Sequence, residues 1–176
     1  MKSVLISIQP KYCELIANGK KTVEVKKAKP KIDVPFKCYI YMTRGKPTFE
    51  QSAFRDEISN GKVIGEFICD RIYYIKNLVT AFSIDYDEKL TNRIGNASCL
   101  DFWDMRNYLQ DKDGYAWHIS ELVIHDEPKL LEKFFKPCGN CDKKGTMRCT
   151  EEITPCRATK ITRPPQSYCY VEELGV

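Results

Sequence analysis

The sequence lacks any long hydrophobic run. The first apolar stretch, 4–8, is short and is followed by Pro10 and Lys11. A secretory signal needs a longer apolar segment, and a membrane-spanning helix needs about 20 apolar residues, so the sequence predicts neither. It also lacks internal repeats, low-complexity tracts and the regular strand–helix alternation of a doubly wound sheet. These absences favour a cytoplasmic protein built around one domain.

A disulfide framework is not expected either. The chain has nine cysteines, an odd number, and no predicted secretion signal, and reducing compartments keep thiols free. Four of the cysteines lie singly within apolar patterns, where cysteine packs as a small hydrophobic residue: Cys13, Cys38, Cys69 and Cys99.

The remaining feature of the cysteines is a cluster near the C-terminus, at Cys138, Cys141, Cys149 and Cys156. A C-x-x-C turn presents two thiolates, which is half of a tetrahedral zinc site, and the other two cysteines could complete it. The segment has few large apolar residues, so it needs a metal ion or packing to become ordered. The sequence predicts a Cys-rich insertion over 136–159 that holds structural zinc. The alternative is a loop with incidental thiols.

Positive charge is concentrated at the start of the chain. Residues 1–47 contain eleven Lys and Arg against three Asp and Glu, whereas residues 48–126 contain eight against fourteen. Such a patch attracts phosphates more strongly than the overall net charge of +4 suggests. A lysine-rich face that is merely solvated is the other interpretation.

Short strands dominate the predicted secondary structure. Alternation of apolar and polar residues predicts strands over 4–8, 22–27, 36–43, 62–74, 115–125 and 167–172. Helices are expected from Pro10 to Asn18, over 48–60, over 99–110 with Trp103 on its buried side, and as a turn within 128–135; residues 76–98 are expected to form a loop with a helical turn. Gly65 is expected to mark a bulge. Five or six mixed strands with short flanking helices predict an α+β barrel.

The densest group of charges follows the first helix, in Gly19-Lys20-Lys21-Thr22-Val23-Glu24-Val25-Lys26. Glu24 and Lys26 share one face of the predicted strand. Lysines there could hold a phosphate or a base edge while Glu24 accepts a proton or orients a lysine. Spacing alone equally permits an exposed Glu–Lys pair of little energetic value.

This segment is similar to the ASCH family, which is related to the PUA RNA-binding barrels. Ile8-Gln9-Pro10 leads into a short helix, and the family signature G-x-K-x-x-E-x-R is matched by Gly19, Lys21 and Glu24, with Lys26 where arginine is usual. The resemblance continues through the 61–67 and 114–119 strands and covers 1–135 plus 160–176. It implies a PUA-like barrel whose basic cleft, lined by this motif, binds RNA or a nucleotide-like ligand.

The resemblance leaves enzymatic activity open. Some ASCH-like proteins are amidohydrolases that remove an acyl group from modified cytidine, and some relatives are reported as ribonucleases. The amidohydrolases carry a nucleophilic threonine where this chain has Glu24. If the chain is an enzyme, Lys21 and Glu24 are the candidate catalytic residues. A third interpretation is an accessory protein whose Cys-rich segment binds a protein partner.

Further candidates for the cleft are residues that suit base stacking or proton transfer: Lys11, Tyr12, Tyr41 and His118. Trp117 is more typical of a core side chain. Because a ligand-binding residue is expected to be exposed, changing Lys21 or Glu24 to alanine is predicted to cost little stability.

Overall fold

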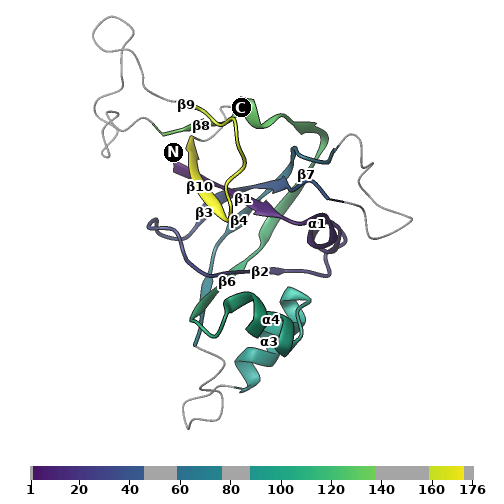
Figure 1. The fold of residues 1–176 in the computed structure, drawn as a ribbon, viewed down its shortest axis with the longest axis vertical. Helices are drawn as coiled ribbons and strands as arrows, with labels where there is room; N and C mark the ends of the chain where they lie inside the picture. The colour runs from purple at the N-terminus through teal and green to yellow at the C-terminus, as the bar shows by residue number, and fades with distance from the viewer. Residues whose placement is uncertain (1, 46–58, 77–87, 138–158, 173–176) are drawn as a thin grey trace, which may run out of the picture.

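The computed structural model describes residues 2–45, 59–76, 88–137 and 159–172. Within these ranges the strands form a five-stranded, a three-stranded and a two-stranded sheet. Figure 1 shows the first two sheets stacked across the middle of the molecule, with helices beside and below them.

The five-stranded sheet has the order β10-β1-β3-β4-β7. β1 pairs in parallel with β3 and antiparallel with β10, and β3–β4 and β4–β7 are antiparallel. The strands span β1 Lys2–Ile8, β3 Phe36–Met42, β4 Val63–Cys69, β7 Ser120–Lys129 and β10 Tyr168–Glu172.

The three-stranded sheet has the order β2-β6-β5 and is antiparallel throughout. Its strands are β2 Val23–Lys26, β5 Ile72–Ile75 and β6 Gly114–His118. The two sheets meet at a corner, where β4 leads into β5 and β6 leads into β7. There the His118 amide donates to Arg71 O at 2.9 Å and Ser120 Oγ donates to Ile68 O at 2.8 Å.

Short helices flank the sheets. α1 Pro10–Ala17 follows β1, and α3 Glu88–Ser98 and α4 Phe102–Leu109 lie against the three-stranded sheet (Figure 1). Pro10 suits the first turn of α1 because its missing N–H needs no partner there. A 3-10 helix, η2 Leu131–Lys133, precedes the two-stranded sheet of β8 Phe135–Lys136 and β9 Thr159–Lys160.

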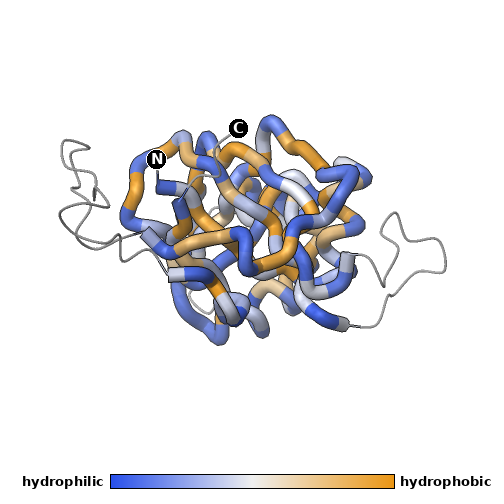
Figure 2. The backbone as a smooth tube through the Cα atoms, turned by 90° about the horizontal axis from the view of Figure 1, so that it is seen from above, coloured by the Kyte–Doolittle hydropathy of each residue, from blue (hydrophilic) through white to orange (hydrophobic). Residues whose placement is uncertain are grey.

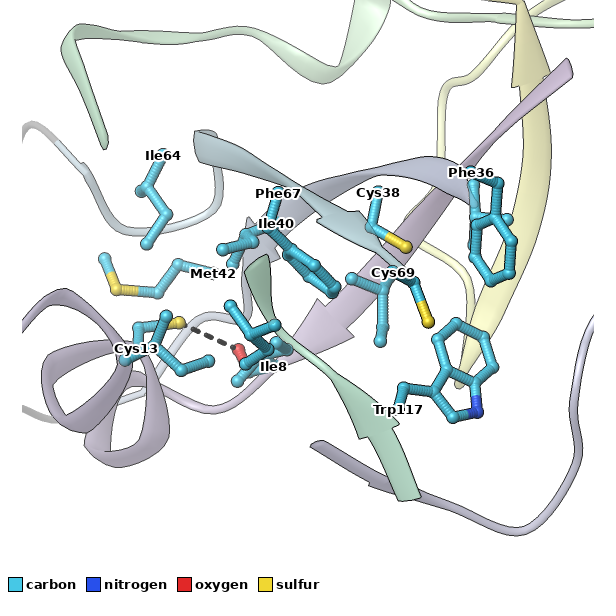
Figure 3. Packing of buried hydrophobic residues seen from close by; sticks show 14 residues of the cluster. Ile8, Cys13, Phe36, Cys38, Ile40, Met42, Ile64, Phe67, Cys69 and Trp117 are labelled. Carbon is cyan, nitrogen blue, oxygen red and sulfur yellow. Dashed lines mark hydrogen bonds between the residues drawn. The ribbon is translucent and has the colours of Figure 1, made fainter. Parts of the chain in front are cut away.

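The main core lies between the two large sheets. Alternate β1 residues Val4, Ile6 and Ile8 pack there, together with Trp117 of β6, which is fully buried. Figure 2 shows hydrophobic stretches of the backbone crossing the middle of the molecule, and Figure 3 shows Trp117 beside Phe36. The core position expected for Trp117 is therefore confirmed.

Three cysteines belong to this core. Cys13, Cys38 and Cys69 are buried free thiols (Figure 3). Burial raises the pKa of the Cys13 and Cys38 thiols, and it raises that of Cys69 to about 12. They therefore act as small hydrophobic side chains, as the sequence predicts. Cys99 is only half-buried and donates from Sγ to Lys20 O at 3.4 Å.

Several boundaries differ from the sequence prediction. The strand expected over 62–74 is two strands separated at Asp70 and Arg71, and the strand expected over 115–125 is interrupted at Ile119. Because each half pairs in a different sheet, the chain must bend at both positions. Part of the loop expected over 76–98 is the helix α3, and Trp103 is 63% exposed instead of buried. Most of the helix expected over 48–60 lies outside the described residues.

The mixed α+β class is confirmed, but the closed barrel is not. Strand pairing in the described ranges gives separate sheets that share a corner, with no pairing that closes them into one ring. The irregularity predicted at Gly65 is present, because the register shifts there between β4 and β7. A Cβ atom at Gly65 would lie 2.5 Å from Val123 O, so only glycine allows this approach.

None of the helices in the described ranges is long and apolar enough to cross a membrane.

Candidate functional site

The turn between α1 and β2 places the charged motif. Gly19 adopts φ +69°, the left-handed conformation that ends the helix, as the sequence predicts. The amides of Lys20 and Lys21 both donate to Leu15 O at 2.9 Å, which fixes the path of the turn. The Thr22 amide then donates to Ala97 O of α3 at 2.8 Å. The start of β2 is thus held from both sides.

Three side chains of this segment form a buried ionic cluster, which we call the Lys–Glu–Lys cluster. Lys21 Nζ lies 3.2 Å from Glu24 Oε2, and Lys26 Nζ lies 3.1 Å from Glu24 Oε1. All three residues are buried, at 2%, 7% and 4% exposure for Lys21, Glu24 and Lys26. The carboxylate therefore sits between two ammonium groups, with one oxygen facing each.

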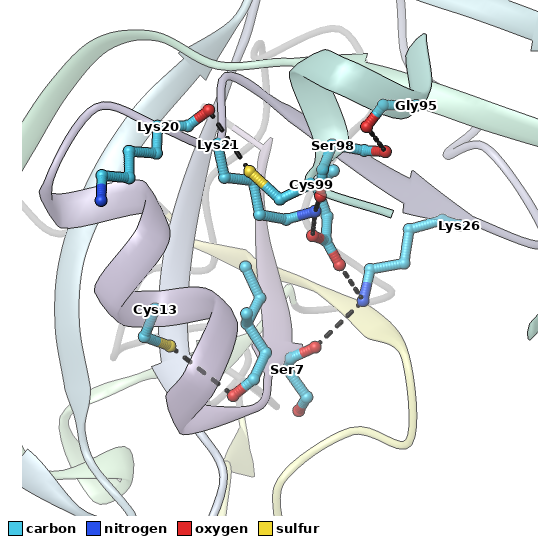
Figure 4. Close-up of polar contacts among 10 residues, drawn as sticks. Ser7, Cys13, Lys20, Lys21, Lys26, Gly95, Ser98 and Cys99 are labelled. Atoms are coloured by element: carbon cyan, nitrogen blue, oxygen red, sulfur yellow. Dashed lines mark hydrogen bonds and ion pairs between the residues drawn. The ribbon is translucent and has the colours of Figure 1, made fainter. Parts of the chain in front are cut away.

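Backbone carbonyls complete the cluster from two other elements. Lys21 Nζ donates to Ser98 O at the end of α3 at 2.7 Å, and Lys26 Nζ donates to Ser7 O of β1 at 3.0 Å. Figure 4 shows the side chains of Lys21 and Lys26 reaching toward these two carbonyls. The Tyr12 ring from α1 lies 4.9 Å from Lys21 Nζ. The two ammonium positions are fixed by groups that are distant in the sequence.

The cluster keeps Glu24 ionised. Burial alone would raise the pKa of its carboxyl group, but the positive charges and hydrogen bonds of Lys26 and Lys21 outweigh that effect. Its pKa therefore lies below the usual value. At neutral pH the side chain is a carboxylate that only accepts hydrogen bonds.

The Lys–Glu–Lys cluster forms one wall of a pocket of about 340 Å³. The pocket is lined by residues of β1, α1, β2 and α4, by residues directly before these elements, and by one residue each after β3 and before β10: Ser7, Ile8, Gln9, Tyr12, Lys21, Glu24, Val25, Lys26, Thr43, Leu100, Asp104, Tyr108 and Gln166. Its charged lining consists of two lysines and two carboxylates, since the exposed Asp104 joins Glu24. Three of these charged side chains, Lys21, Glu24 and Lys26, are buried, whereas Asp104 is exposed.

Two tyrosines, Tyr12 and Tyr108, line this pocket. Burial, together with the negative charges of Asp104 and Glu24, raises the pKa of Tyr12. Burial, with a smaller effect of Glu24, raises the pKa of Tyr108 to about 12. Both phenols are therefore neutral at physiological pH and offer hydroxyl groups and ring faces to a ligand.

The structure brings together part of the predicted site. Tyr12, Lys21, Glu24 and Lys26 all line the pocket. Lys11 is exposed and does not line the pocket, but its Nζ lies 5.3 Å from the centre of the Tyr12 ring.

Two predicted residues lie elsewhere. Tyr41 is 4% exposed and packs in a second core cluster, on the opposite side of β3 from the main core. His118 is half-buried at the corner between the sheets, where its Nδ1 lies 2.5 Å from Asp70 Oδ1. The hydrogen bond to His118 lowers the pKa of the Asp70 carboxyl group. Neither side chain lines the pocket.

Sequence reasoning missed the far wall of the pocket. Asp104 and Tyr108 are four residues apart on α4, a spacing that places them on one helical face. The spacing alone predicts that the two side chains share a helical face. Nothing in the sequence predicts that this face lies near β2. Thr43 and Gln166 carry no recognisable signal.

The proposed zinc ligands Cys138, Cys141, Cys149 and Cys156 lie outside the described residues. In the part of the chain that the structure covers, no group of three or more His, Cys, Asp or Glu side chains could hold a metal ion.

The arrangement of sheets and helices is that of a known class, the ASCH fold. The crystal structure of ASCH from Zymomonas mobilis matches 97% of this chain and 88% of its own length, with a TM-score of 0.58 and 17% sequence identity. A variant of that protein with one tyrosine changed to phenylalanine matches 98% of this chain and 92% of its own, with a TM-score of 0.56 and 16% identity. A serine-to-alanine variant matches 97% and 89%, with a TM-score of 0.51 and 16% identity.

The ASCH resemblance read from the motif is thus confirmed for the fold. No family model matches the sequence, and no curated protein matches it. At 16–17% identity the likeness concerns the backbone arrangement alone.

Proposed function

We propose that this protein binds single-stranded RNA by taking one unpaired nucleotide into the pocket. The observation that carries the proposal is the Lys–Glu–Lys cluster on the pocket wall. Its charges are buried, which is costly, yet they face a cavity of about 340 Å³, a size that suits a ligand of one nucleoside. Charged groups held in fixed positions on the wall of such a cavity offer hydrogen-bonding partners to a ligand that enters it.

The tyrosines of the pocket fit the same ligand. Unpaired bases in RNA complexes stack on aromatic rings and form hydrogen bonds through their edges. Tyr12 and Tyr108 supply neutral rings at the pocket, and the cluster supplies fixed polar groups. A base that is paired in a duplex could not enter, so the proposal is restricted to single strands.

Attraction of the phosphates is assigned to a different surface. In the pocket, Glu24 and Asp104 offset the two lysines. The loop between β2 and β3 carries Lys27, Lys29 and Lys31, all exposed, and we call these three residues the lysine loop. These three ammonium groups are part of the accessible positive charge of the N-terminal segment and can attract phosphates.

The lysine loop is tied to the body of the protein and adjoins the pocket. The Lys31 amide donates to Tyr170 Oη at 2.6 Å, and Tyr168 Oη donates to Lys29 O at 2.9 Å. Lys27 Nζ lies 5.6 Å from the ring centre of Tyr108, which lines the pocket. An RNA strand with one base in the pocket would therefore pass close to the Lys27 ammonium group, and Lys29 and Lys31 follow on the same loop.

The test compares RNA strands by fluorescence anisotropy. A labelled single-stranded 12-mer is expected to bind, and the same strand annealed to its complement is expected to bind at least tenfold more weakly. Tyr108→Ala removes a stacking surface of the pocket and is expected to weaken binding of the single strand by about tenfold. Tyr74→Ala, at an exposed tyrosine of β5 outside the pocket, is the control. Equal binding of duplex and single strand, or equal loss in both variants, would contradict the proposal.

The second candidate function is hydrolysis of a modified nucleoside or of RNA. The direct contact of Lys21 and Glu24 on the pocket wall favours it, because an ammonium group and a carboxylate there could stabilise charge and move a proton. Incubation with a panel of acylated nucleosides and short RNAs would release product, and the Lys21→Ala variant would release none. A panel without any released product would exclude this candidate for those substrates.

A further inference from the structure

The Lys–Glu–Lys cluster has unused hydrogen-bonding capacity that can be counted. An ammonium group has three N–H donors, and a carboxylate has about four acceptor positions. Lys21 Nζ uses one donor on Ser98 O and one on Glu24, and Lys26 Nζ uses one on Ser7 O and one on Glu24. Among the described residues no further acceptor contacts either ammonium group, and the Tyr12 ring at 4.9 Å makes only a cation–π contact with Lys21, so each lysine has a third N–H for a ligand.

The order of these groups along the wall is donor, acceptor, donor. Glu24 lies between the two lysines, with Oε2 toward Lys21 and Oε1 toward Lys26. Both lysines and Glu24 line the pocket, so the row faces the ligand. A ligand that satisfies all three positions must present acceptor, donor, acceptor.

We propose that the pocket selects a base with an imide edge, in which one N–H is flanked by two carbonyl groups, and therefore selects uracil among the four RNA bases. The two carbonyl oxygens of uracil would accept from Lys21 and Lys26, and its N3–H would donate to Glu24. The inference rests on the proposed function, since it requires that a base occupies the pocket.

The other bases and phosphate each leave one position mismatched. Cytosine places the lone pair of N3 opposite the carboxylate and an amino donor opposite one of the ammonium groups. Guanine offers one carbonyl and two donors, so one lysine faces an N–H. Adenine has a single donor beside an acceptor. A phosphate carries only acceptors, and its charge would be repelled by Glu24 at the centre of the row. An unmatched polar group in a buried site is costly, and this cost provides the selectivity.

The test uses isothermal titration of the wild-type protein with nucleosides. Uridine is expected to bind at least tenfold more tightly than cytidine. N3-methyluridine keeps both carbonyls and loses the central N–H, and it is expected to bind at least tenfold more weakly than uridine. Dihydrouridine keeps the imide edge without an aromatic ring, and it is expected to bind more tightly than cytidine.

Variants of the protein test whether Glu24 determines the selectivity. Glu24→Gln places an amide between the lysines and is expected to reduce the uridine-to-cytidine ratio to about one. Glu127→Gln, the same change at an exposed carboxylate of β7, is expected to leave the ratio unchanged. If Glu24→Gln does not fold, the nucleoside series on the wild-type protein decides the question.

The outcomes separate the two proposals. Equal affinity for uridine, cytidine and N3-methyluridine would overturn the imide selectivity and leave the base-binding pocket in place. If no nucleoside binds, the pocket does not hold a base, and both proposals fail.

Discussion

Glu24 is the residue on which the site depends most. A buried carboxylate between two buried ammonium groups contributes little net stability compared with well-packed apolar residues, but removing it leaves two uncompensated charges. The sequence alone led us to expect little loss of stability on changing Lys21 or Glu24 to alanine. Burial reverses that expectation, because both side chains are part of the interior.

We expect Glu24→Gln to reduce the free energy of unfolding at neutral pH by about 3 kcal/mol. The loss should depend on pH. The pKa of Glu24 is lower in the folded protein than its usual value of 4.5, so its contribution is present above that pH and disappears as the pH falls through the folded-state pKa. Urea denaturation between pH 3 and pH 7 measures this. A stability gap between wild type and variant that fails to narrow on acidification would show that Glu24 is not held ionised by the lysines.

At the scale of single residues, the sequence located side chains that line the pocket but did not show what surrounds them. Gly19, Lys21, Glu24 and Lys26 could be found because a short motif fixes their spacing. Whether a charge on a strand is buried or solvated depends on what packs over it. Here Ser98 and Ser7, which cover the lysines, are far away in the sequence.

At the scale of secondary-structure elements, β4 and β7 approach each other closely at Gly65. An added Cβ would lie 2.5 Å from the backbone atom Val123 O, which cannot move away without disturbing the sheet. We expect Gly65→Ala to lower stability by about 2 kcal/mol or more. Gly19→Ala is the comparison, because a Cβ there has no neighbour within 4 Å and only the left-handed φ of +69° opposes it, at a cost of about 1 kcal/mol. Thermal or urea unfolding that ranks the two variants in the opposite order would contradict this account.

The lysine loop is the element that should govern RNA affinity through charge. We expect the combined change Lys27→Ala, Lys29→Ala and Lys31→Ala to weaken binding of a single-stranded 12-mer by at least tenfold. For single strands the slope of log K against log salt is about −0.7 per contacted phosphate, so loss of three contacts should reduce the slope by about 2.

A matched control removes the same charge elsewhere. Lys89, Lys112 and Lys133 are exposed on or beside α3, α4 and η2, and the triple alanine variant at these positions should keep the wild-type salt slope. An equal loss of slope in both triple variants would mean that net charge, and not the position of the loop, attracts the RNA.

The type of a secondary-structure element could be predicted where one of its faces is buried, but the residues at which it begins and ends could not. The alternation of Cys38, Ile40 and Met42 predicts β3, and these residues do face the main core. The bends at Asp70 and Ile119 escaped prediction because a strand that crosses from one sheet to another keeps the same local pattern on both sides. Trp103 escaped because an aromatic residue in a helical pattern normally indicates a buried position.

At the scale of the whole molecule, the pocket joins segments that no local pattern connects. Its lining draws on residues 7–12, 21–26, 43, 100–108 and 166. A sequence motif supplies one of these walls, and the others depend on how the two sheets and α4 come together. The fold class could therefore be anticipated from strand and helix patterns, whereas the shape of the site depends on tertiary packing that these patterns do not encode.

The last prediction concerns zinc binding by the predicted Cys-rich segment, residues 136–159. We expect purified protein to contain one zinc ion per chain, measured by elemental analysis after dialysis, and the Cys138→Ser and Cys141→Ser double variant to contain none. Changing Cys99 and Cys169, which are half-buried free thiols, to serine removes the same number of cysteines and should leave the zinc content unchanged. If the wild-type protein contains no zinc, the prediction is wrong and the four cysteines are incidental thiols.

The pairing of β1 with β10 has a consequence for how the protein is made. β1 lies inside the five-stranded sheet, between β3 and a strand that begins at Tyr168. During translation β1 can therefore associate with β3 early, but one of its hydrogen-bonding edges stays open until residue 172 has left the ribosome. A nascent or prematurely terminated chain would present that edge to other polypeptides, and such truncated products should accumulate in inclusion bodies or on chaperones.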